Sequence, residues 1–123
     1  MKYLKKFETT EKDKSGNELV DAVCDNKYYV AKNLLDSGFK VDSVAKTNNT
    51  PLLYAAYQGK WNFVFLLLKY NPTWEIKDSS NTDFIDYINQ WVGGNKVLEN
   101  IIKCYPERYQ EYISKKEALK YNL

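Results

Sequence analysis

The clearest pattern of apolar and polar positions lies in residues 50–68, TPLLYAAYQGKWNFVFLLL. Thr50 is a favourable helix N-cap, and Pro51 follows at the first helical position, where a missing amide hydrogen costs nothing. Gly59 ends this first helix, because glycine readily adopts the left-handed conformation of a C-terminal turn. The apolar run WNFVFLLL then follows at helical spacing. The stretch therefore predicts two short antiparallel helices.

The same pattern recurs in weaker form on either side of this stretch, with a period of about 33 residues. Asn17 takes the position of Thr50 in the first copy, and Asp83 takes that position in the third. A fixed period of this length, with matched apolar positions, is typical of a protein built from stacked repeats. The matched apolar positions include Leu19, Leu52 and Ile85.

The third copy is the least regular of the three. Its first helix could start after Thr82 or after Asp83, and we favour Asp83 because the apolar stripe that follows is then cleaner. The pair Gly93-Gly94 marks the break between its helices one residue later than the period predicts. We therefore expect one inserted residue in the loop between the two helices of this copy.

The central copy resembles the ankyrin repeat. Thr50-Pro51-Leu52 matches the T-P-L start of that repeat, Ala55-Ala56 matches its paired alanines, and Gly59 matches its inter-helix glycine. Leu66-Leu67-Leu68 matches its leucine run, whereas Leu53 stands where the family usually has a histidine. The resemblance implies an all-α fold, a short ankyrin-repeat stack of antiparallel helix pairs with finger turns between the pairs.

Flanking segments lie on either side of residues 15–105, which carry the resemblance. Residues 1–14 are charged and mixed in sign, and they predict either a loose N-terminal arm or a short cap on the first repeat. Pro106 begins a last helix with lysines near its C-terminus, where the helix dipole favours cations. We expect residues 106–123 to form a C-terminal capping helix. The resemblance divides the rest into three repeats, at about residues 15–47, 48–80 and 81–105.

Length and composition are those of one globular domain, with 123 residues, 44% hydrophobic content and a net charge of +2. No apolar stretch approaches the ~20 residues that a membrane-spanning helix needs, and the N-terminal sequence lacks the apolar core of a signal peptide. Cys24 and Cys104 lie far apart without metal-ligand spacing, so we expect two free thiols. These features predict a cytoplasmic location.

The sequence offers little for catalysis. It contains no histidine, which is the commonest general base and the commonest metal ligand. Gly93-Gly94 does not follow a strand pattern and so does not indicate a phosphate-binding loop. Asp25 beside Cys24 would raise rather than lower the pKa of that thiol. We therefore expect a non-enzymatic protein with no cofactor and no metal.

What remains is a binding surface, which in the ankyrin stack is the concave face formed by the fingers and the first helix of each repeat. Tyr57 is the strongest candidate there, because tyrosine supplies contact area at low entropic cost; the alternative is that it packs on a neighbouring finger. Trp74 is a second candidate, with the alternative that it seals the gap between repeats. By position, the resemblance implies partner contacts at Lys46, Thr47, Asn49, Tyr57, Gln58, Trp74, Ser79, Ser80 and Trp91. Neighbouring positions on the same face are Cys24, Asp25, Thr82 and Gln90.

Two functions fit these features. The first is a small protein-binding module, monomeric on its own, that inhibits one partner protein by steric occlusion or serves as an adaptor. A toxin-neutralising immunity protein is one such role. The second is a nucleic-acid-associated protein that uses N-terminal lysines with aromatic side chains as stacking platforms. Near-neutral net charge and a single arginine, Arg108, favour the first. The lysines in question are Lys2, Lys5, Lys6, Lys12 and Lys14.

Overall fold

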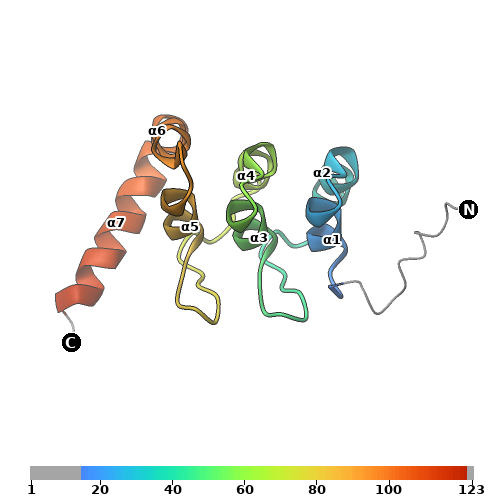
Figure 1. Ribbon diagram of the computed structural model, residues 1–123, viewed down its shortest axis with the longest axis horizontal. Helices are drawn as coiled ribbons and strands as arrows, with labels where there is room; N and C mark the ends of the chain where they lie inside the picture. Colours follow the sequence, from blue (N-terminus) through green and yellow to red (C-terminus); the bar gives the residue numbers. More distant parts are fainter. Residues whose placement is uncertain (1–14, 122–123) are drawn as a thin grey trace, which may run out of the picture.

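The computed structural model describes residues 15–121, and within that range the chain is all-helical, with seven helices and no strand (Figure 1). The predicted all-α class is thus confirmed for these residues. Residues 1–14, for which the sequence predicts an arm or a cap, and residues 122–123 lie outside the described range. The helices are α1 (Glu18–Cys24), α2 (Tyr28–Asp36), α3 (Pro51–Tyr57), α4 (Trp61–Leu68), α5 (Phe84–Gln90), α6 (Gly94–Cys104) and α7 (Pro106–Tyr121).

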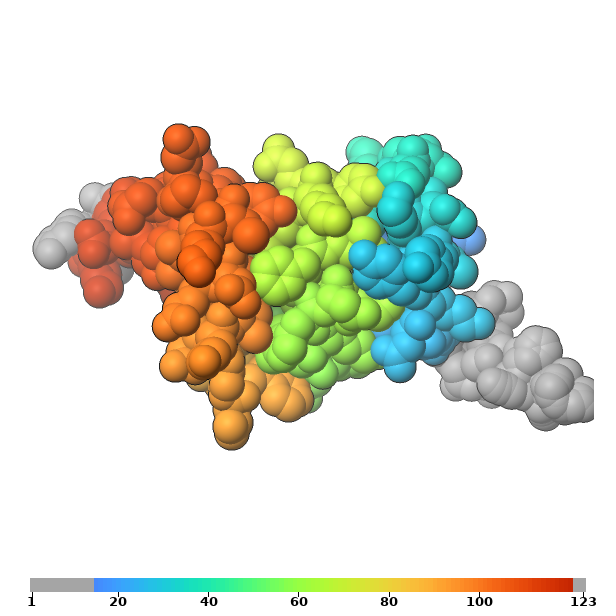
Figure 2. Space-filling model, turned by 90° about the horizontal axis from the view of Figure 1, so that it is seen from above, coloured from blue at the N-terminus to red at the C-terminus, as the bar shows by residue number. Residues whose placement is uncertain are grey.

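The first six helices form three pairs, α1–α2, α3–α4 and α5–α6, which lie side by side in a row (Figure 1). Seen from above, the pairs follow one another as bands from blue through green to orange (Figure 2). The second helices line one edge of the row, and two long loops, residues 37–50 and 69–83, extend from the opposite edge. α7 packs on α6 and closes the C-terminal end.

Each pair begins at a buried polar N-cap, and the three caps, Asn17, Thr50 and Asp83, are evenly spaced along the chain. The Asn17 side chain accepts from two amides of the first turn of α1, at 2.9 and 3.0 Å. The Thr50 hydroxyl accepts from Leu53 N at 3.3 Å. Asp83 and Asp86 form a reciprocal capping box at the start of α5. The predicted start of the first helix of the third copy after Asp83, rather than after Thr82, is confirmed.

The helices of each pair are joined by connections of equal length, residues 25–27, 58–60 and 91–93. The insertion predicted for the third copy is therefore wrong. Trp91 has an extended backbone (φ −90°, ψ 143°), and the left-handed residue follows at Gly93, one position later in the connection than Gly59. The glycine thus occupies a different position in a connection of the same length. The start of α6 therefore lies one repeat period after the start of α4.

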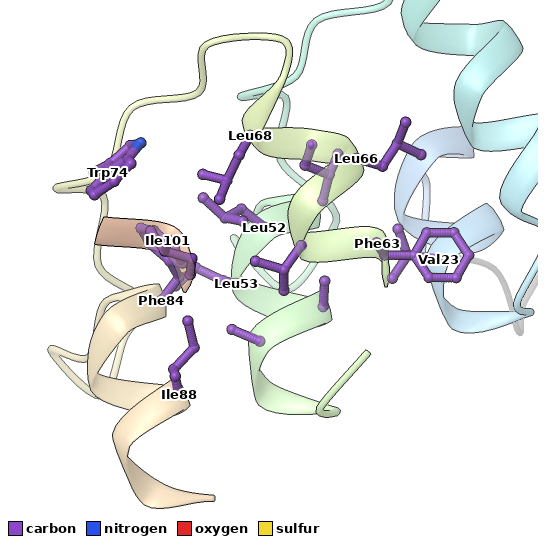
Figure 3. Close-up of a cluster of buried hydrophobic side chains, with 14 of the residues drawn as sticks. Val23, Leu52, Leu53, Phe63, Leu66, Leu68, Trp74, Phe84, Ile88 and Ile101 are labelled. Carbon is purple, nitrogen blue, oxygen red and sulfur yellow. The ribbon is translucent and has the colours of Figure 1, made fainter. Parts of the chain in front are cut away.

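Apolar side chains fill the space between neighbouring pairs (Figure 3). Val23 and Phe63 lie between the first and second pairs, and Phe84 and Ile101 lie between the second and third. The first helices of neighbouring pairs approach more closely than the second helices do. Small residues permit this approach, because the buried pair Ala55-Ala56 on α3 leaves room for backbone on either side.

α7 is held on the third pair by polar contacts as well as apolar ones. Arg108 donates two hydrogen bonds to the carboxylate of Glu75, at 2.8 and 3.0 Å. Tyr112 is buried, and its hydroxyl donates to the Asp83 carboxylate at 2.8 Å. The last helix therefore covers the N-cap of α5.

Candidate functional site

Two adjoining cavities, of about 360 and 560 Å³, form a groove across α3, α5 and the second long loop. They share Tyr57 and Tyr87, which stand at the boundary between them. We call this surface the Tyr57 groove. Its first cavity is lined by Asn49, Leu53, Tyr54, Tyr57, Asp78, Ser79, Ser80 and Tyr87. Its second cavity is lined by Tyr57, Gln58, Gln90, Trp91 and again Tyr87.

Three tyrosines dominate the first cavity, and helical spacing explains how they meet. Tyr54 and Tyr57 are three residues apart on α3 and so lie on one helix face. Tyr87 on α5 follows Tyr54 by one period and occupies the same place in the next pair. The rings of Tyr57 and Tyr87 are 5.3 Å apart at 77°, so they form two walls that meet edge to face. Tyr57 remains 60% exposed and is the most accessible of these rings.

Asp78 fixes the loop side of the groove. One of its carboxylate oxygens accepts from the amides of Ser80 and Thr82, at 2.9 and 3.2 Å, which shapes the tip of the second loop. The other oxygen accepts from the hydroxyl of Tyr87. This hydrogen bond raises the pKa of Tyr87 to about 12, so its phenol stays protonated at neutral pH. This hydrogen bond therefore ties the loop to α5.

Two side-chain amides in the groove carry acceptors without partners. The Oδ1 atom of Asn49 and the Oε1 atom of Gln58 are both shielded from solvent, and neither accepts a hydrogen bond from a described residue. The other end of the Gln58 amide contacts Cys24 Sγ at 3.9 Å. Unpaired buried acceptors are costly in a folded protein, so these two positions reduce the stability of the surrounding structure.

Trp91 closes the second cavity. Its indole nitrogen donates to Ala56 O at 3.1 Å, and its ring meets Trp61 edge to face with centroids 6.0 Å apart. A Cβ atom on Gly59 would come within 3.0 Å of this ring, so the indole lies directly on the α3–α4 connection. The side chain is nevertheless 43% exposed. One edge of Trp91 therefore holds two pairs together while the rest faces the groove.

The groove carries one carboxylate and no cation. Asp78 is the sole ionisable group besides the tyrosines among its lining residues. Within residues 15–120, Asp78 takes part in no ion pair, whereas the carboxylates of Glu75, Asp83 and Asp86 each have a lysine or an arginine within 4 Å. The lining is thus aromatic, neutral polar and weakly negative.

The structure brings most of the sequence-predicted site residues to this groove. Lys46 and Thr47 are exposed at the tip of the first long loop and do not line either cavity, although the Thr47 hydroxyl lies 3.0 Å from that of Tyr54. Cys24, Asp25 and Thr82 also lie outside the lining. The predicted residues that do line the groove are Asn49, Tyr57, Gln58, Ser79, Ser80, Gln90 and Trp91.

The assignment of Trp74 to partner contacts is wrong. Its side chain is 2% exposed and lies on the loop before α5 (Figure 3). It packs edge to face on Phe84 at 5.3 Å and on Tyr105 at 6.3 Å, and the Arg108 guanidinium stands 5.2 Å over its ring. Trp74 therefore seals the junction between the third pair and α7, a structural role close to the predicted alternative, in which it seals the gap between repeats.

Four residues of the groove are not predicted from the sequence. The repeat period is the sequence feature that could have indicated some of them. Tyr87 lies one period after Tyr54, and Asp78 lies one period after Ala45 at the loop tip. In both loops the residue at this position donates its amide to a carbonyl four residues on, at 2.9 Å for Ala45 and 3.1 Å for Asp78. A search for polar or aromatic side chains at matched positions would find two of the four. The missed residues are Leu53, Tyr54, Asp78 and Tyr87.

Cys24 is half-buried near the groove and forms no disulfide bond. Burial is the main cause that raises the pKa of its thiol; Gln58 and Lys60 oppose the rise, and Asp25 adds to it. The thiol is therefore held in its protonated, poorly nucleophilic form at neutral pH. Lys60 is engaged elsewhere, because its ammonium donates to the carbonyls of Val23 and Cys24 at the end of α1, at 2.8 and 2.9 Å.

Comparison with known proteins adds no relative to this picture. No protein-family model matches the chain, and a search of curated proteins finds no match. Among residues 15–121, none of the helices is long and apolar enough to cross a membrane. The contacts of the described residues are therefore the basis for any functional inference.

Proposed function

We propose that the chain is an ankyrin-type repeat protein with three repeats and a C-terminal cap. The period supports this proposal, because helix starts, buried N-caps and inter-helix connections all recur at the spacing of the sequence pattern. The loop tips recur as well: Asn48 and Asn81 are both left-handed and both donate to a carbonyl three residues back, at 2.9 Å. Closely packed first helices, with the long loops extending from their side of the row, are what such a stack requires.

We propose further that the protein is a non-enzymatic module that binds one partner protein in the Tyr57 groove. The observation that carries this is the groove itself, which crosses two repeats and gathers Tyr54, Tyr57, Tyr87 and Trp91 on one surface. Tyrosine and tryptophan dominate binding hot spots, because they bury a large area with few rotatable bonds.

Pre-organisation supports the same function. Asp78, Tyr87 and the loop amides are already hydrogen-bonded to one another, and Trp91 is fixed by Ala56. A partner would therefore lose little conformational entropy of the groove on binding. Tyr57 is the exception, since it is 60% exposed and its ring is free to be buried by the partner. We expect it to be the main anchor.

Within this class we favour an inhibitor that occludes its target, for example a toxin-neutralising immunity protein. The support for this is that the described residues form helix pairs with a last helix packed against them, and that the groove is lined mainly by aromatic and neutral polar side chains. The proposal includes a cytoplasmic location, which two unpaired cysteines favour, and a monomer in the absence of the partner.

Partner capture tests this function. Tagged wild type and two variants, Tyr57→Ala in the groove and Tyr29→Ala outside it, would be used to recover proteins from a lysate of the source cells. Tyr29 is the matched control, because it is 75% exposed on α2 and lines neither cavity. We expect one stoichiometric protein with wild type and Tyr29→Ala that is lost with Tyr57→Ala. Equal recovery by all three would place the interface elsewhere.

The nucleic-acid function is the weaker alternative. It depends on Lys2, Lys5, Lys6, Lys12 and Lys14, which lie outside the described residues. The groove itself contains no lysine or arginine to neutralise phosphates. Affinity that falls steeply between low and moderate salt would favour this alternative, whereas a groove that relies on aromatic contacts would change much less.

A further inference from the structure

We propose that the first cavity of the Tyr57 groove receives a cationic side chain, an arginine or a lysine, from the partner protein. This inference rests on the proposed function and names the kind of side chain that the groove would recognise on the partner protein. A cavity of about 360 Å³ is near the lower end of the ~300–1,000 Å³ typical of small-ligand sites. It therefore fits one long side chain rather than a stretch of folded polypeptide.

Charge is the first argument. Asp78 contributes a carboxylate to the cavity wall and has no lysine or arginine within 4 Å among the described residues. The three neutral donors that it accepts from, the amides of Ser80 and Thr82 and the hydroxyl of Tyr87, solvate the charge without cancelling it. A carboxylate held in this way favours the arrival of a cation, and its attraction strengthens as a partner excludes water.

Aromatic walls are the second argument. Tyr54, Tyr57 and Tyr87 line the cavity, and the rings of Tyr57 and Tyr87 are nearly perpendicular to each other. Ammonium and guanidinium groups are attracted to the faces of such rings, most strongly where water is excluded. An anionic side chain would meet the repulsion of both the ring faces and Asp78.

Acceptors are the third argument. A guanidinium has five N–H donors and an ammonium has three, and neither can accept a hydrogen bond. The cavity lining contains acceptors that suit them, namely the hydroxyls of Ser79 and Ser80 and the carboxylate of Asp78. A cationic head entering the cavity could donate to these oxygens.

Titration followed by two-dimensional NMR tests the inference directly. The probes would be the N-acetyl methylamides of arginine, lysine and norleucine; norleucine has a comparable chain length and no charge. With the two cationic probes, we expect changes in NMR chemical shift that are centred on Asn49, Tyr57 and Tyr87. These probes should bind with a Kd in the millimolar range. Norleucine should bind about tenfold more weakly.

Asp78→Asn is the decisive variant. Asparagine keeps an oxygen that can accept from Ser80 and Thr82, so the loop tip should hold its shape while the charge is lost. Binding of the cationic probes should weaken towards the level of norleucine, with a smaller preference left by the tyrosine rings. Glu99→Gln removes an exposed charge on α6, away from the groove, and should change nothing.

Three outcomes separate this inference from the proposed function. Selective, Asp78-dependent binding of the cations supports it. Equal binding of all three probes in the groove overturns the inference, while leaving the groove as a protein-binding surface. If no probe perturbs the groove, the inference is likewise overturned, and partner capture with Tyr57→Ala then decides the proposed function by itself.

Discussion

The hydroxyl of Tyr112, on the last helix, donates a 2.8 Å hydrogen bond to the carboxylate of Asp83, the N-cap of α5. Both side chains are buried, at 2% and 1% exposure. Burial raises the pKa of Asp83, although the hydrogen bonds from the Asp86 amide and from Tyr112 oppose the rise. Tyr112 therefore stabilises a charge that would otherwise be poorly solvated, and it couples α7 to the start of the third pair.

Replacement of Tyr112 by phenylalanine should lower the free energy of unfolding by about 1–3 kcal/mol, because the ring stays while Asp83 Oδ2 loses its hydrogen-bond donor and keeps only the Lys116 ammonium at 3.7 Å. Urea denaturation of the whole chain measures this loss. Tyr109→Phe is the matched control, since Tyr109 is only partly buried and its hydroxyl makes no hydrogen bond with a described residue. Equal stability of the two variants would show that α7 does not depend on the Asp83 contact.

Acid should weaken the docking of α7 through Glu75. The Arg108 guanidinium lowers the pKa of Glu75 below its ordinary value of 4.5, against the opposing effect of burial. A depressed pKa means that the stabilisation is fully present above about pH 4.5 and is lost as the pH falls through the lower, folded-state value. Both side chains stay partly exposed, at 21% and 25%, so we expect only about 1 kcal/mol.

Glu75→Gln tests this assignment. The variant should be less stable than wild type at pH 7, and the difference should shrink as the pH is lowered below 4.5, because wild type then loses the same charge. Thermal unfolding at a series of pH values measures it. A difference that stays constant across the acid range would mean that Glu75 acts through packing and not through its charge.

Gly94 is the position least tolerant of a side chain. A Cβ atom there would lie 1.9 Å from the carbonyl oxygen of Ile88, so the start of α6 would have to move. We expect Gly94→Ala to cost about 3 kcal/mol or more in unfolding free energy. Gly38→Ala is the control that distinguishes this clash from backbone strain. Gly38 has φ +96° but open space around it, so only backbone strain should contribute. Its substitution should lower the unfolding free energy by about 1–2 kcal/mol. Similar losses at both sites would contradict the close approach of α5 and α6.

The leucine run of α4 forms the centre of the core. Leu67 has no exposed surface, and Leu67→Ala should cost about 2–5 kcal/mol, as truncation of a packed core residue does. Leu119→Ala removes the same atoms from a residue that is 59% exposed, and it should change stability by less than about 0.5 kcal/mol. A loss below about 1 kcal/mol at Leu67 would mean that α4 is not packed between its neighbours.

Local chemistry made the helix starts predictable from the sequence. Asn17, Thr50 and Asp83 are all good cap residues at one spacing, and each occupies the predicted position. Tyr57 could be placed outward because it immediately precedes the residues that end α3. These are short-range features, in which the residues that decide the structure are neighbours in the chain.

Long-range contacts were not predictable in the same way. The burial of Trp74 depends on Arg108 and Tyr112, which lie more than thirty positions further along the chain. The groove depends on a hydrogen bond between Asp78 and Tyr87, and neither residue stands out alone in the sequence. The predicted insertion was wrong because the glycine shifts by one position inside a connection whose length stays the same, and the position of a glycine in the sequence does not reveal the length of the connection.

The central claim is that Tyr57 anchors a partner protein in the groove, and the most direct test is the affinity of the captured partner for purified variants. Isothermal titration calorimetry would compare wild type, Tyr57→Ala and Tyr29→Ala, after thermal melts show that all three are equally stable. We predict that Tyr57→Ala raises Kd about 30-fold or more, the ~2 kcal/mol of a hot spot, while Tyr29→Ala leaves Kd unchanged. A Tyr57→Ala effect below about threefold would contradict the account.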